Sequence, residues 1–131
     1  MTMRFVLALA AAAALIGVAG AAEAQTSLGG DAIRGAAVFK QQCSACHSVE
    51  PGAEGAAPNL RGVLRRKAGS DPGFTAYTPA IKASRIIWTP ANLDTFLSGP
   101  SRMIPGTAMP ITVPDAKTRH DLIAYLGSLK R

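Results

Sequence analysis

The stretch QQCSACHSVE, residues 41–50, contains both cysteines of the 131-residue chain and one of its two histidines. Cys43 and Cys46 are three positions apart, so in a helical turn their thiols lie on one side. His47 follows four positions after Cys43, and its imidazole can reach that same side. The pattern therefore gathers two nucleophilic sulfurs and one metal-binding nitrogen at a single point of the chain.

The spacing Cys-x-x-Cys-His is the attachment signature of c-type haem. Two thiols add to the vinyl groups of a porphyrin as thioethers, and the adjacent imidazole ligates the iron. A redox dithiol normally accompanies a βαβ pattern, which is not visible here. A zinc site needs four ligands, and His120 is the only other histidine. A disulfide across so short a loop would restrain little of the unfolded chain, so the stretch predicts one covalently bound haem c.

The first 24 residues are predicted to be a secretory signal peptide. Arg4 precedes an apolar run over residues 5–19, and residues 22–24 form a small-x-small cleavage pattern. A run of about 15 residues is shorter than the roughly 20 that span a bilayer, although an uncleaved anchor is the alternative. We expect a signal peptide at 1–24 and a single small domain at 25–131, exported to the periplasm.

The chain is basic, with 14 Lys and Arg residues against 8 Asp and Glu and a net charge of +6. A basic surface suits nucleic acid, an anionic membrane surface or an acidic protein. An exported protein rarely meets nucleic acid, so we expect no nucleic-acid partner. With one Trp and two Tyr, the core is poor in aromatic residues, and a large buried cofactor would stabilise it.

The sequence indicates an all-α fold, because helical patterns alternate with Gly- and Pro-rich loops and no pair of alternating strands is visible. Asp31 can cap a helix that runs toward Cys43, and Gly35 on its inward face suggests close approach by another helix. Helices are also expected near 78–84, from Thr89-Pro90 to Gly99, and from about Asp115, the last with an apolar stripe of Leu122, Ile123, Leu126 and Leu129. Three prolines are expected to exclude a helix from 101–114.

Several segments besides the haem signature resemble the class I cytochromes c, from about Gly35 to Leu129. The pair Gly35 and Phe39 matches the N-terminal helix of that family, and further matches are APNLRG (57–62), RRKAGSDPGFTAYTPA (65–80), MIPGTAMP (103–110) and RHDLIAYL (119–126). The resemblance implies the class I cytochrome c fold, with three to five helices wrapped around one covalently bound haem. It also implies an electron carrier that is not an enzyme.

The resemblance implies His47 and Met109 as the axial iron ligands. Methionine provides a soft, neutral thioether, and the Pro-rich loop around Met109 is stiff. Met103 is the rival, but it stands where the family carries a packing residue. The backbone carbonyl of Pro58 would accept a hydrogen bond from His47. Thr107 and Phe96 would support the methionine side of the haem.

Arg66, Tyr77 and Trp88 resemble the family's donors to the haem propionates. Arginine suits a carboxylate, and a buried Tyr or Trp needs a partner for its polar hydrogen. Alternatives to Arg66 are its basic neighbours Arg61, Arg65 and Lys67. The family often has one residue between the Phe and Tyr of this segment. This chain has two, Thr75 and Ala76, which leaves the contact of Tyr77 open.

With both axial positions occupied, the iron would have no vacancy for a substrate, which indicates outer-sphere electron transfer. We expect a monomeric periplasmic carrier whose partners are redox proteins, such as a periplasmic dehydrogenase, a membrane respiratory complex or a terminal oxidase, with a transient membrane-surface contact left open. A haem c subunit dedicated to one such enzyme is the alternative. A haem enzyme or gas sensor would need an open sixth position. Gln42 and Ala108 replace lysines common in the family, which predicts a haem edge ringed by neutral and apolar residues.

Overall fold

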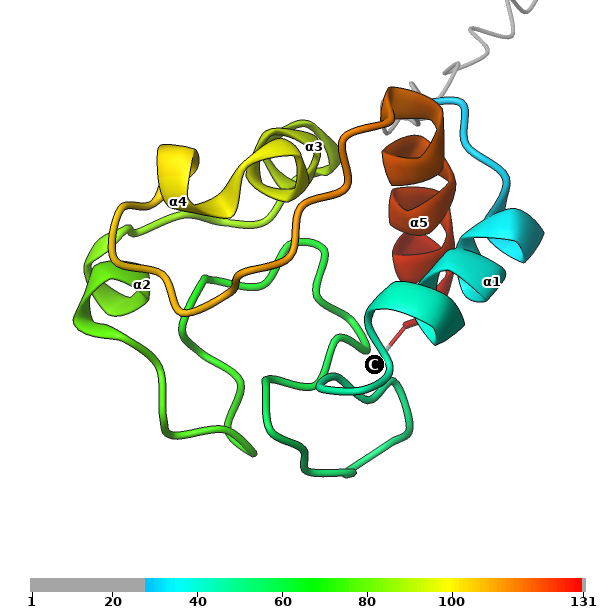
Figure 1. Ribbon diagram of the computed structural model, residues 1–131. Coiled ribbons are helices and arrows are strands. Elements are labelled where there is room, and N and C mark those ends of the chain that lie inside the picture. Colours follow the sequence, from blue (N-terminus) through cyan, green and yellow to red (C-terminus); the bar gives the residue numbers. More distant parts are fainter. Residues whose placement is uncertain (1–27, 131) are drawn as a thin grey trace, which may run out of the picture.

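The computed structural model describes residues 28–130, so the signal peptide and cleavage site expected from the sequence lie outside the described residues. Its helices are α1 (Ala32–Gln42), α2 (Pro79–Ala83), α3 (Pro90–Ser98), α4 (Pro100–Met103) and α5 (Ala116–Ser128) (Figure 1). Within 28–130 there is no β-strand, and only one isolated antiparallel bridge joins Lys67 and Ile87. The all-α prediction is therefore confirmed.

Side-chain caps define four of the helix starts. Asp31, Thr78, Thr89 and Asp115 each accept a hydrogen bond from a backbone N–H in the first turn of the helix that follows. At the start of α3 the side chain of Asn92 also accepts from the backbone N–H of Thr89, which completes a capping box. Local sequence signals thus fix where α1, α2, α3 and α5 begin, as predicted.

Helix α4 is a correction to the sequence-based expectation for 101–114. A single turn of helix begins with Pro100 and ends at Met103, so its last three residues fall in the segment expected to be free of helix. Proline is compatible with the first turn of a helix because that position needs no donor. The turn ends before Pro105, so the prolines exclude helix only from about residue 104 onward.

Helices α1 and α5 cross closely on one side of the molecule (Figure 1). A Cβ atom at Gly35 would overlap the backbone carbonyl of Asp121 and the Cβ of Tyr125, so only glycine allows this approach. The rings of Phe39 and Tyr125 pack beside the crossing with centroids 5.8 Å apart. The close helix contact that Gly35 predicted is therefore confirmed.

The buried carboxylate of Asp121 links α5 to α1 at the same crossing. Asp121 accepts hydrogen bonds from Arg34 Nε at 2.8 Å, Lys117 Nζ at 3.1 Å and the backbone N–H of Asp31 at 2.7 Å. The hydrogen bond from Arg34 is the main reason that the pKa of Asp121 is held well below its usual range. Asp121 of α5 thus holds the start of α1 against α5.

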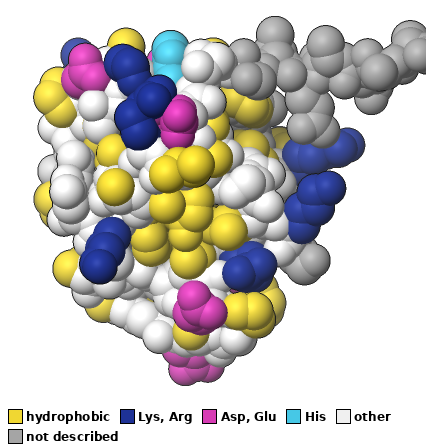
Figure 2. Space-filling model, turned by 90° about the vertical axis from the view of Figure 1, so that its right-hand side faces the viewer, with side chains coloured by type: hydrophobic (Ala, Val, Ile, Leu, Met, Phe, Trp, Pro, Cys, Tyr) yellow, Lys and Arg dark blue, Asp and Glu magenta, His cyan; other side chains and the backbone are white. Residues whose placement is uncertain are grey.

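The face that includes α1 mixes apolar and charged side chains. Apolar side chains gather in its middle, and Lys, Arg, Asp and Glu are scattered around them (Figure 2). Ile33 of α1 is 85% exposed, the most exposed large apolar side chain among residues 28–130. Within that same part of the chain, no helix combines the length and apolar character needed to cross a membrane.

Candidate cofactor site

A pocket that is partly open to solvent lies between the helices and the loop that follows α1. Its empty space, with the open solvent at its mouth included, is about 980 Å³. Apolar side chains from α2, α3, α5 and the loops make most of its wall: Leu60, Val63, Ile81, Leu93, Leu97, Leu122 and Leu126. Nine of the ten predicted site residues line it, namely Cys43, His47, Pro58, Arg66, Tyr77, Trp88, Phe96, Thr107 and Met109. Cys46, the tenth, is exposed and is not part of the lining.

The Cys43–His47 segment continues α1 as a hydrogen-bonded turn. The backbone N–H of Cys43 donates to Phe39 O at 2.9 Å, and those of Cys46 and His47 donate to Cys43 O at 3.1 and 2.9 Å. Cys43 is buried, which raises the pKa of its thiol to about 11. No disulfide joins Cys43 and Cys46.

His47 is oriented by a backbone carbonyl. Its Nδ1 lies 2.7 Å from Pro58 O, and because a carbonyl only accepts, Nδ1 carries the proton and Nε2 keeps its lone pair. Burial lowers the pKa of His47, as does the charge of Arg66, while the hydrogen bond to Pro58 acts in the opposite direction. The ring is therefore predominantly neutral at pH 7, which is the form that binds a metal.

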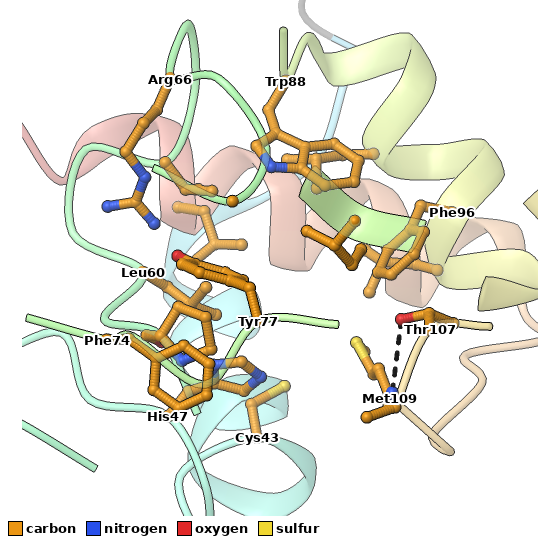
Figure 3. Close-up of a pocket in the computed structure, with 18 of the residues that line it drawn as sticks. Cys43, His47, Leu60, Arg66, Phe74, Tyr77, Trp88, Phe96, Thr107 and Met109 are labelled. Atoms are coloured by element: carbon orange, nitrogen blue, oxygen red, sulfur yellow. Dashed lines mark hydrogen bonds between the residues drawn. The ribbon is translucent and has the colours of Figure 1, made fainter. Parts of the chain in front are cut away.

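Met109 enters the pocket from another wall, with its sulfur on the inner side (Figure 3). Its backbone N–H donates to Thr107 Oγ1 at 3.4 Å, and Thr107 N–H donates to Ile104 O at 3.0 Å. Met103, the rival ligand, does not line the pocket and packs against the hydrophobic core. The fold thus brings a thioether and an imidazole 62 positions apart in sequence to the same cavity.

Polar groups gather where Arg66, Tyr77 and Trp88 meet the pocket (Figure 3). Arg66 is only 8% exposed, and its Nη2 donates to Asn59 O at 2.6 Å. The Tyr77 oxygen accepts from the backbone N–H of Asp71 at 3.1 Å, and burial raises the pKa of Tyr77, so its hydroxyl keeps a proton to donate. Within the described chain the indole N–H of Trp88 has no hydrogen-bond partner, and Figure 3 shows this nitrogen on the pocket side.

The four basic side chains considered as propionate donors differ in whether they line the pocket. Arg66 and Lys67 line the pocket, whereas Arg61 and Arg65 do not. Arg61 donates from Nε to Val49 O at 2.6 Å and from Nη1 to Lys130 O at 3.1 Å, and Arg65 is exposed.

Sequence reasoning missed two residues at the site, Phe74 and Asp71. Phe74 lines the pocket and packs edge-to-face on Tyr77, with centroids 4.9 Å apart, so the additional residue between them does not remove Tyr77 from the site. Asp71 pairs with Arg66, Nη1 to Oδ1, at 3.4 Å. The signal that could have revealed Asp71 is that it is the first acid after the basic run of residues 61–67.

Comparison with known proteins decides the family. A family model described as Cytochrome c matches residues 32–130. The chain belongs to the cytochrome c family. It is 48% identical over 101 residues to a cytochrome c of Tetrahymena pyriformis, covering 76% of this chain and 90% of that one. It is 39% identical over 117 residues to a cytochrome c2 of Rhodomicrobium vannielii, covering 88% and 92%.

Solved structures of family members show the same fold. Cytochrome cH from Methylobacterium extorquens superposes with a TM-score of 0.70 at 39% identity, covering 76% of this chain and 99% of that one. Cytochrome c2 from Rhodospirillum centenum gives a TM-score of 0.72 at 34% identity, covering 78% and 100%. The chain therefore has the class I cytochrome c fold expected from the sequence.

Family membership makes haem c the cofactor and electron transfer the activity. Covalent haem c is bound throughout this family, and the chain has the two cysteines that such an attachment requires. The pocket suits this group, because a flat apolar macrocycle matches the Leu-, Ile- and Val-rich wall and its two carboxylates match the donors at the polar end. The members are electron carriers, so the chain is an electron-transfer haem protein.

Proposed function

We propose that this cytochrome c carries single electrons between redox proteins in the periplasm, with His47 and Met109 as the axial ligands of its iron. The observation that best supports this proposal is that both side chains line the same pocket. His47 is fixed by Pro58 with Nε2 available, and Met109 presents its sulfur from another wall. The bound haem supplies the one-electron Fe(III)/Fe(II) couple.

The remaining site residues hold and shield the cofactor. Cys43 and Cys46 anchor it through thioether bonds, with Cys43 inside the pocket and Cys46 at its exterior. Arg66, Tyr77 and Trp88 donate hydrogen bonds to the propionates. Arg66 and Trp88 are buried and Tyr77 is half-buried, and the donor of each suits a carboxylate. Phe96 packs on Trp88, with centroids 5.0 Å apart, and excludes water from the methionine side.

These roles favour an electron carrier over an enzyme. A methionine in the sixth position leaves no site for a substrate, and methionine ligation raises the reduction potential. Burial raises the potential further, because an apolar site disfavours the more highly charged ferric form. We infer a positive potential, suited to the late steps of an electron-transfer chain.

The proposed location and partners rest on several observations together. Residues 1–24 carry the pattern of an export signal, and relatives of the chain include bacterial cytochromes c2. A periplasmic dehydrogenase, a membrane respiratory complex or a terminal oxidase would be the class of partner. A subunit dedicated to one such enzyme is the second candidate, and it would use the same haem chemistry.

Visible spectroscopy of the purified exported protein tests the axial ligands. We expect a far-red charge-transfer band in the ferric protein, and Met109→Ala should abolish it and allow carbon monoxide to bind the ferrous protein. Met103→Ala is the matched control and should keep the band. An unmodified protein that binds carbon monoxide readily would contradict methionine ligation, and a colourless folded protein would end the proposal.

A further inference from the structure

Asp71 is a largely buried acid that lies behind the polar end of the pocket, where it contacts Arg66 and Tyr77 of the pocket wall. Its side chain is 11% exposed and that of Arg66 is 6% exposed. Oδ1 of Asp71 pairs with Arg66 Nη1 at 3.4 Å, and Oδ2 accepts the backbone N–H of Asn59 at 3.1 Å. The backbone N–H of Asp71 donates to the Tyr77 oxygen at 3.1 Å. One residue therefore contacts two of the three proposed propionate donors.

Stability alone does not account for this pair. Removing two charges from water costs about as much as their mutual attraction returns, so a buried ion pair is often no more stabilising than an apolar pair of the same volume. A fixed charge in a poorly solvated interior nevertheless acts strongly on other charges nearby, because little solvent screens it. The Arg66–Asp71 pair lies at a pocket where the charge of the cofactor changes by one unit.

We propose that Asp71 is a positioning residue, which orients Arg66 through its carboxylate and Tyr77 through its backbone N–H toward the haem carboxylates. The negative charge of Asp71 then sets the reduction potential of the protein below the value that Arg66 alone would give. Reduction adds one electron at the cofactor, so a nearby negative charge opposes it and a nearby positive charge favours it. The inference rests on the proposed function, because it requires Arg66 and Tyr77 to face the propionates.

The first test is the midpoint potential of the Asp71→Asn holoprotein. Asparagine keeps the shape and one oxygen for the Asn59 N–H but removes the charge. We expect the equilibrium constant for reduction to rise by up to about tenfold, which corresponds to about 59 mV for a one-electron couple. A residue that only supports the fold would lower the unfolding midpoint and leave the potential where it is.

Glu54→Gln is the matched control because it makes the same change in net charge on the same side of the loop. A Cβ at Gly73 would meet Asp71 Oδ2 at 3.7 Å and Glu54 Cγ at 3.9 Å, so both acids lie next to this glycine. Glu54 is exposed, and solvent screening should keep its effect on the equilibrium constant below about twofold.

A second comparison keeps the test decisive if Asp71→Asn alone does not fold. Arg66→Gln should lower the potential, and adding Asp71→Asn should raise it again by a similar factor. The double variant leaves no unpaired buried charge, so it avoids the main cost of the single change.

An unchanged or lower potential on removing Asp71 in both backgrounds, with the far-red band intact, would overturn this inference and leave the proposed function standing. Loss of methionine ligation in the unmodified protein would instead overturn the proposed function.

Discussion

The two loops that deliver the proposed iron ligands are held in different ways. On the histidine side, residues 47–77 are linked by many hydrogen bonds from side chains to backbone carbonyls. Asn59 Nδ2, for example, donates to Glu50 O at 2.7 Å and to Ala53 O at 3.0 Å. On the methionine side, only two hydrogen bonds in the described chain involve residues 105–112, and both join them to residues within three positions.

The difference shows two ways to fix a ligand. The histidine loop is a polar network in which losing one member leaves a buried group without its partner. The methionine loop relies on the restricted backbone of Pro105 and Pro110, with one threonine hydroxyl between them. Damage on the histidine side should therefore appear as lost stability, and damage on the methionine side as a weakened sixth ligand.

The largest expected effect is on the histidine side. Arg66→Ala should lower the free energy of unfolding of the holoprotein by about 3–5 kcal/mol, because Asp71 would remain as an unpaired buried charge and Asn59 O would lose its donor. Guanidinium chloride unfolding measures the change.

Arg102→Ala is the control near the methionine loop. Arg102 is exposed and donates to Ser98 O at 2.8 Å. Removing its side chain should change the free energy of unfolding by less than about 0.5 kcal/mol. If Arg66→Ala and Arg102→Ala lowered the free energy of unfolding equally, the two loops would not differ in how they contribute to stability.

A smaller and different effect is expected from Thr107→Val on the methionine side. The variant keeps the shape of the side chain but removes the acceptor for Met109 N–H, and a hydrogen bond of this kind contributes about 0.5–1.5 kcal/mol. Added imidazole should therefore displace Met109 at about three- to tenfold lower concentration, as followed by loss of the far-red band.

Thr112→Val is the control in the same loop, because Thr112 is exposed and makes no hydrogen bond in the described chain. It should leave the imidazole titration unchanged. If Thr107→Val unfolded the protein as severely as Arg66→Ala and left imidazole binding unaltered, the methionine loop would not be the weaker side.

The features that sequence predicted correctly depend on local chemistry. Asp31, Thr89 and Asp115 start helices through a hydrogen bond to a residue three positions on, which sequence spacing alone encodes. Gly35 predicted the α1–α5 crossing because glycine destabilises a helix interior, so it is expected there mainly where a second backbone must approach closely. The Cys-x-x-Cys-His pattern likewise places its groups within one turn.

The features that sequence did not predict depend on side-chain direction in loops. Four neighbouring basic residues, 61 and 65–67, have similar sequence surroundings, yet Arg61 reaches Val49 O and Lys130 O while Arg66 turns toward the pocket. Asp71 makes its contacts with residues five, six and twelve positions away, a pattern with no helical or strand period. Only the folded loop selects among these arrangements.

The smallest expected effect concerns how a reactant approaches the methionine side. Residues 103–114 contain no charged side chain, and exposed Ala108 lines the pocket while Ile111 is 44% exposed. On the histidine side, by contrast, Lys67 is exposed and lines the pocket. Oxidation of the reduced protein by anionic ferricyanide should therefore depend only shallowly on salt, and Ala108→Lys should steepen that dependence.

The added lysine should raise the rate severalfold at low ionic strength, with the two proteins converging above about 0.1 M, where the Debye length falls to about 10 Å. Ala37→Lys is the control, because Ala37 is exposed on α1 and does not line the pocket. The two substitutions give the protein the same net charge. A local route through the methionine side requires Ala108→Lys to have the larger effect. Equal slopes in the two variants would mean that ferricyanide responds to the overall charge of the protein, and the uncharged rim would then have no special part in electron transfer.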